Sequence, residues 1–183
     1  MDLSTSSTTQ IIIKSETDEE VVFDAKFVEL SDFVKNAQVR TAPFITDIPT
    51  ELLNWVKIFC EKHNYSAASM TYTFPTVVDY PRGNLSEISY ELMAGFYVEG
   101  NISETAKRIA PYISVADKLQ FRKLYTTLNV FLLSPLHIDE TDNSIKEFMV
   151  KYNLKEDEDF SAEKIHMAIR DNCEMFELVN ERF

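Results

Sequence analysis

Glycine is scarce in this 183-residue chain, which contains only three, at positions 83, 95 and 100. Tight hairpin turns and phosphate-binding loops depend on glycine because it adopts positive φ angles without steric cost. Sheet-rich folds with many tight turns are therefore disfavoured, and so are glycine-rich nucleotide-binding loops. The chain is expected to be mainly helical.

Basic residues are also few, with 18 Lys and Arg against 30 Asp and Glu, so the formal net charge is −12. Nucleic acids and anionic membranes are bound by clustered Lys and Arg. We therefore expect no nucleic-acid partner. The densest acidic run, at 156–159, is interpreted as a solvated loop, and an acidic surface for a basic partner is the alternative.

The chain has two cysteines and no long hydrophobic run. Cys60 and Cys173 fall in separate helical patterns, which indicates reduced, packed thiols rather than a disulfide framework. No apolar stretch approaches the roughly 20 residues that span a bilayer, and the N-terminus lacks the pattern of a signal peptide. Cytoplasm and nucleus are the predicted locations, with no membrane partner.

Sequence motifs for catalysis or metal binding are absent. The histidines His63, His137 and His166 are isolated, without the spacing of zinc ligands, and each is expected to be hydrogen-bonded or exposed. Neither cysteine belongs to a recognisable nucleophile motif, and no hydrolase or kinase signature occurs. We expect a non-catalytic protein without cofactor or metal, although a site assembled from distant residues stays open.

The first part of the chain predicts a small sheet with short helices. Residues 1–9 are Ser/Thr-rich and are expected to form a disordered tail. Apolar runs at 10–14 and 21–23 predict a β-hairpin, and residues 43–45 a brief third strand. Two short helical patterns occupy 25–38, the second of them capped by Ser31.

A longer helix is predicted to run to about His63, with Asp47 as its cap and Pro49 in its first turn. Trp55 lies at the edge of its apolar face and Ile58 outside it. The wide face implies burial on two sides. It comprises Leu52, Leu53, Val56, Phe59 and Cys60.

Residues 65–84 lack periodicity and are interpreted mostly as a long surface loop, in which 76–78 could add a strand. Everything after this loop is expected to be helical. Pro111 should divide one helical region in two, because proline removes a helical hydrogen bond. One predicted helix carries the apolar stripe Leu85, Ile88, Leu92 and Phe96, and the next is capped by Ser103. A third carries the stripe Phe121, Leu124, Tyr125, Leu128, Phe131 and Leu132. Two further helices are predicted at 142–152 and 161–179. The predicted organisation is a domain at 10–133 followed by a helical extension at 134–183.

Several stretches, in order along the chain, resemble the S-phase kinase-associated (Skp) adaptor family. Residues 53–63 are similar to that family's Leu-x-x-Val-Ile-x-Trp-Cys-x-x-His helix, with Phe59 in the tryptophan position. The resemblance implies a BTB/POZ-like α/β domain, mainly helical with a small sheet, and a C-terminal helical extension. The other similar stretches are 11–23, 116–124, 144–154, 159–161 and 170–172.

The resemblance also implies a function. Members of the family link a cullin scaffold to F-box substrate receptors in ubiquitin ligases and perform no chemistry themselves. Residues Asp117, Lys118 and Leu119 would then face the cullin, together with the helix from Leu52, although Asp117-Lys118 replaces the family's Asn-Tyr pair. The F-box-binding residues would be Leu124, Leu128, Phe131, Ile145, Phe148, Met149, Ile169 and Phe176.

A second hypothesis comes from the altered pair at Asp117-Lys118. The chain could keep the fold but use it for self-association, as a homo-oligomer or a scaffold outside a ubiquitin ligase. The two hypotheses differ in whether a cullin binds.

Overall fold

The computed structural model describes residues 10–37, 43–136 and 150. The chain divides into two units, residues 1–137 and 138–183. The predicted tail at 1–9 and the helices at 142–152 and 161–179 lie outside the described residues, apart from Val150.

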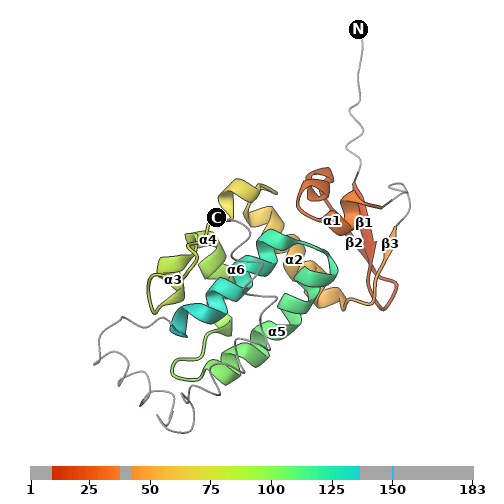
Figure 1. The fold of residues 1–183 in the computed structure, drawn as a ribbon. Coiled ribbons are helices and arrows are strands. Elements are labelled where there is room, and N and C mark those ends of the chain that lie inside the picture. The colour runs from red at the N-terminus through yellow and green to blue at the C-terminus, as the bar shows by residue number, and fades with distance from the viewer. Residues whose placement is uncertain (1–9, 38–42, 137–149, 151–183) are drawn as a thin grey trace, which may run out of the picture. The chain divides into compact units, whose positions relative to one another are not determined.

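Three strands form a small mixed sheet, as the sequence predicts. β1 (Ile11–Lys14) pairs antiparallel with β2 (Glu20–Phe23), and β3 (Phe44–Ile45) pairs parallel with the other edge of β1. The strand order is β2-β1-β3. Figure 1 shows the sheet on one side of the helices, and α2 (Thr50–Lys62) contacts β2. One face of the β1–β2 hairpin is buried, through Ile11, Ile13, Val21 and Phe23.

The turn between β1 and β2 closes without glycine. Asp18 takes the left-handed conformation, with φ 63°, which Asp tolerates better than most residues. The hydroxyl of Ser15 accepts hydrogen bonds from the amides of Thr17 and Glu19, at 3.3 and 3.2 Å. An Asp and a Ser therefore close this turn without a glycine pair.

Two short helices follow the sheet, as predicted. Asp24 caps the 3-10 helix η1 (Ala25–Glu29), and Ser31 caps α1 (Asp32–Lys35) by accepting from the amide of Val34. Both are polar side chains that satisfy otherwise free amides at a helix start.

α2 buries four of the five residues of the predicted face, and it leaves Leu52 half-buried and Ile58 45% exposed. The predicted cap is wrong. Pro49 occupies the cap position and its carbonyl accepts from the amides of Leu52 and Leu53, while Asp47 pairs with Lys118 instead. Asp47 lies two residues before the cap position, and its carboxylate accepts a hydrogen bond from Lys118 at the end of α5 (Ile102–Lys118).

The stretch predicted as a long loop contains the 3-10 helix η2 (Ala67–Ser69) and the short helix α3 (Pro81–Asn84). Residues 76–78 form no strand. The buried side chain of Asn84 accepts from the amide of Val77 and donates to the carbonyl of Val78, at 2.8 and 2.7 Å. These bonds satisfy the backbone groups that a strand partner would otherwise have to satisfy.

α4 (Glu87–Met93) continues into η3 (Ala94–Phe96). The apolar stripe predicted here is right for Leu85, Leu92 and Phe96, which pack against the core, and wrong for Ile88, which is 37% exposed. The fully buried residues of α4 are Ser89 and Met93. Ser89 faces inward because its hydroxyl meets the ring of buried His63, at 3.0 Å. Because Ser89 is polar, the spacing of hydrophobic residues does not identify the buried face of α4.

α5 (Ile102–Lys118) is one continuous helix, so the predicted division at Pro111 is wrong. Proline leaves the carbonyl of Lys107 without its helical partner. Both residues are exposed, and water can solvate that carbonyl. The cap is also corrected, because Asn101 rather than Ser103 accepts from the amide of Glu104.

α6 (Arg122–Leu133) ends in the 3-10 turn η4 (Ser134–Leu136) and packs against α5. Rings from distant segments meet in the core: Phe27 lies 5.9 Å from Phe121, and Phe59 lies 6.3 Å from it, both edge-on. These contacts join η1, α2 and the start of α6. No helix among the described residues is long and apolar enough to cross a membrane.

A candidate protein-binding surface at the end of α5

The residues predicted to face a cullin lie at the C-terminal end of α5. Asp117 and Lys118 are exposed there. Leu119 is fully buried in the core, so its prediction as a cullin contact is corrected: it packs beneath the surface instead. Its carbonyl accepts a 2.6 Å hydrogen bond from the hydroxyl of Ser31.

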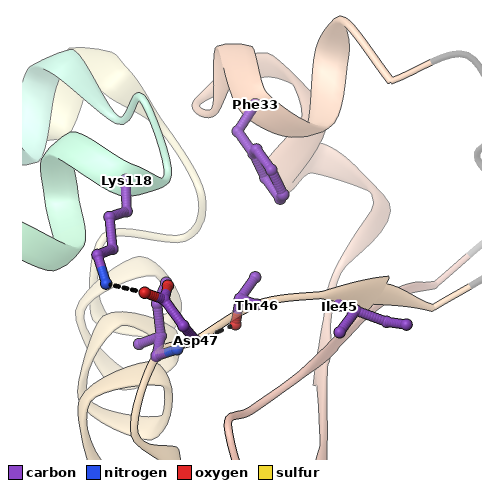
Figure 2. Close-up of a pocket in the computed structure, with 6 residues that line it drawn as sticks. Phe33, Ile45, Thr46, Asp47 and Lys118 are labelled. Atoms are coloured by element: carbon purple, nitrogen blue, oxygen red, sulfur yellow. Dashed lines mark hydrogen bonds and ion pairs between the residues drawn. The ribbon is translucent and has the colours of Figure 1, made fainter.

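Lys118 borders a shallow surface depression of ≈ 500 Å³. Three separate segments supply its walls: α1, the strand β3 with the residues after it, and the end of α5. Figure 2 shows the side chain of Phe33 pointing toward the segment that carries Thr46 and Asp47. The lining residues are Phe33, Ile45, Thr46, Asp47, Ile48 and Lys118.

An ion pair crosses one side of the depression (Figure 2). Lys118 Nζ donates to Asp47 Oδ2 at 2.6 Å. The hydrogen bond from Lys118 holds the pKa of the Asp47 carboxyl below its usual range. Both side chains stay accessible, at 41% for Lys118 and 79% for Asp47, so the pair adds little to stability and remains available to a partner.

The opposite side is apolar. Strand alternation in β3 turns Phe44 into the core and Ile45 outward, where it is 77% exposed. Phe33 is half-buried and lies 5.9 Å from Phe44, ring centre to ring centre. The strongly exposed isoleucine, the phenylalanine and the charged pair make this depression the candidate contact surface of the described residues.

Backbone contacts fix the walls of the depression. The carbonyl of Gln120 accepts from the amide of Asp32, at 3.3 Å, and Asp32 also pairs with Arg122 at 3.6 Å. On the other wall, Thr46 donates through its amide and its hydroxyl to the carbonyl of Lys14, at 3.0 and 2.9 Å. The surface is therefore held in place before any partner binds.

Three of the predicted F-box contacts are not surface residues. Leu124, Leu128 and Phe131 are fully buried on the inner face of α6. They belong to the core of the first unit, so their assignment as partner anchors is corrected. The other five predicted anchors lie outside the described residues: Ile145, Phe148, Met149, Ile169 and Phe176.

Among the described residues, His63 and Cys60 carry the imidazole and the thiol that could serve in catalysis or metal binding, and both are fully buried. Burial raises the pKa of the Cys60 thiol, which disfavours the reactive thiolate. His63 is hydrogen-bonded on both ring nitrogens, by Ser69 and Ser89, each at 3.0 Å, as expected for an isolated histidine. No group of three or more possible metal ligands occurs within 10–37 and 43–136.

The sequence alone did not identify Phe33, Ile45 or Asp47 as surface residues of one site. A two-residue strand is too short for its alternation to show which side chain points outward. The sequence predicts Asp47 as a helix cap because an Asp before a helical pattern usually is one. The three come together only through the parallel pairing of β3 with β1 and the packing of α1 near the end of α5.

No protein-family model matches the chain, and no curated protein is significantly similar to it. The case for a function therefore depends on the residues and the surface described above.

Proposed function

We propose that this chain is a non-catalytic adaptor of a Skp–cullin–F-box ubiquitin ligase, with a BTB/POZ-like domain and a C-terminal helical extension. The ordered sequence resemblance supports this proposal. So does the α/β, mainly helical architecture with its small three-stranded sheet. In this proposal the chain holds a cullin and an F-box receptor together, in the cytoplasm and nucleus.

The observation that carries the cullin end is the exposed, mixed surface at Ile45 and Lys118. An apolar side chain of the cullin would pack on Ile45 and Phe33 and remove Ile45 from water. Polar groups of the cullin would meet Asp47 and Lys118 at the rim, where charges set orientation and association rate.

The F-box end belongs to the extension at 134–183. Buried aromatic and aliphatic side chains dominate such interfaces. The proposed anchors are Ile145, Phe148, Met149, Ile169 and Phe176.

An affinity capture from an extract of the source cells tests the cullin end. The full-length chain carrying Ile45→Asp should recover at least about tenfold less cullin than the wild type, because a charge replaces the apolar contact. Ile88→Asp, on α4, is the matched control, since Ile88 is also an exposed isoleucine and should bind normally. Equal recovery by the two variants would contradict this site.

The F-box end has its own test. Phe148→Asp and Phe176→Asp should each reduce capture of F-box proteins while leaving cullin recovery unchanged. If both variants keep F-box binding, the anchors at 145–176 are wrong, whatever the cullin result.

A second candidate function, self-association, is favoured by one observation. In the described part of the sheet, β3 is an edge strand with a single neighbour, and edge strands can pair with another chain. Light scattering distinguishes the two: a stable homo-oligomer lost in Ile45→Asp, with no cullin recovered from extracts, would favour the scaffold function.

A further inference from the structure

The turn between β1 and β2 carries a threonine followed by a row of carboxylates. Thr17 precedes Asp18, Glu19 and Glu20, and no other Ser or Thr in the 183 residues is followed by three acidic residues. Kinases with Arg and Lys in the substrate groove select hydroxyl groups followed by such carboxylates, because each carboxylate accepts charge-assisted hydrogen bonds.

The turn presents these groups to solvent. Thr17 and the three acidic residues are all exposed, and the side chain of Asp18 is 83% accessible. Lys14 is the basic residue paired with this turn, at 3.9 Å from both Asp18 and Glu20, a distance that a competing Arg or Lys could displace. The acidic row is therefore open to a basic groove.

Three hydroxyl groups meet at the base of this turn. Thr17 Oγ1 lies 3.0 Å from Ser15 Oγ and 3.1 Å from Thr50 Oγ1, and Thr50 donates to Ser15 at 2.8 Å. Ser15 is 2% exposed, whereas Thr17 is exposed. Of these two turn residues, Thr17 is the exposed one, and an enzyme that used its hydroxyl would replace the hydrogen bonds to Ser15 and Thr50.

We propose that Thr17 is a phosphorylation site for an acid-directed serine/threonine kinase. The Thr17 oxygen forms a bond to the γ-phosphorus of ATP, the bond from that phosphorus to the bridging oxygen breaks, and ADP leaves. The hydroxyl proton passes to the catalytic base of the kinase. The proposal does not depend on the function proposed above.

The modification would act next to the candidate surface. The amide of Glu16 donates to the carbonyl of Ile48, at 3.0 Å, and Ile48 lines the depression. A phosphate adds about 1.5 to 2 negative charges at neutral pH. On Thr17 it would place them beside Thr50, at the start of α2.

The test uses the folded full-length chain with ATP and a purified acid-directed casein kinase. Intact mass should rise by one phosphate, and peptide fragmentation should assign it to Thr17. Thr17→Val should abolish the labelling at this position and Thr17→Ser should retain it, because serine supplies the same hydroxyl group.

A charge-matched comparison tests the recognition. Asp18→Asn/Glu19→Gln/Glu20→Gln should slow labelling by about tenfold or more, since the charge-assisted contacts are lost. Asp79→Asn/Glu91→Gln/Glu99→Gln removes the same number of exposed charges elsewhere and should leave the rate unchanged. Labelling of Thr17 only after unfolding, no labelling, or equal rates in the two triple variants would overturn the proposal.

Discussion

At the scale of single residues, His63 shows how a buried polar group organises the core. Ser69 donates its own hydrogen to a backbone carbonyl, of His63 or Ser66, so its oxygen accepts from His63 Nδ1–H. Ser89 accepts from Ser86 and donates to His63 Nε2. This arrangement favours the neutral ring with its proton on Nδ1, because a proton on Nε2 would leave the hydroxyl hydrogen of Ser89 without its acceptor.

This neutral state predicts a pH dependence of folding. Desolvation lowers the pKa of His63 from its ordinary value of 6.5, so below about pH 6.5 the unfolded chain binds more protons than the folded one. The free energy of unfolding should therefore fall as the pH drops from 6.5 toward the folded pKa. The measurement is urea unfolding between pH 5.5 and 7.5.

His63→Gln is the comparison for that experiment, because glutamine can still donate and accept but does not titrate. The slope of unfolding free energy against pH should be smaller in His63→Gln than in the wild type. Equal slopes would mean that His63 is protonated equally well in both states.

Leu128 tests the corrected role of the inner face of α6. Leu128→Ala should lower the free energy of unfolding by about 2–5 kcal/mol, because it leaves a cavity in the core. Leu133→Ala, at a leucine of the same helix that is 37% exposed, should cost about 1 kcal/mol or less. If chemical denaturation gave equal losses in the free energy of unfolding for the two variants, the assignment of Leu128 to the core would be wrong.

At the scale of elements, α5 shows that a proline does not always end a helix. The helix continues through Pro111 because Lys107 and Pro111 are exposed, so water can solvate the freed carbonyl, and because the inner face, including Ile109 and Val115, stays buried. Tertiary packing on one face outweighs the lost hydrogen bond on the other.

Pro111→Ala distinguishes a continuous helix from two helices. In a continuous helix, alanine restores the hydrogen bond and should raise the free energy of unfolding by about 1–3 kcal/mol. If a second helix began at Pro111, proline would suit its first turn and alanine would bring no gain. Ser114→Ala, also exposed on α5, controls for helix propensity and should change stability by about 0.5 kcal/mol.

The elements that the sequence predicted well are those determined by local patterns. The hairpin, the cap at Ser31 and the buried face of α2 all follow from alternation, capping chemistry or helical spacing within a few residues. The errors arise where a distant contact decides. Ser89 is buried where its hydroxyl forms a hydrogen bond with His63, and the carboxylate of Asp47 pairs with Lys118 instead of capping α2.

At the scale of the whole molecule, the candidate surface combines what the sequence predicted with what it could not. The resemblance predicts a cullin-facing segment at 117–119, of which Asp117 and Lys118 are exposed and Leu119 is fully buried. Phe33 and Ile45 join Lys118 through long-range packing, which no local pattern encodes. The proposed function then requires this surface and the extension at 134–183 to serve two partners at once.

Bridging is therefore the property to measure. A two-step purification would first capture the tagged full-length chain and then capture the cullin from that eluate, with mass spectrometry identifying what remains. The account predicts that F-box proteins are present after the second step, because one copy of the chain holds both partners. Absence of a cullin from the first eluate, or of F-box proteins from the second, would contradict it.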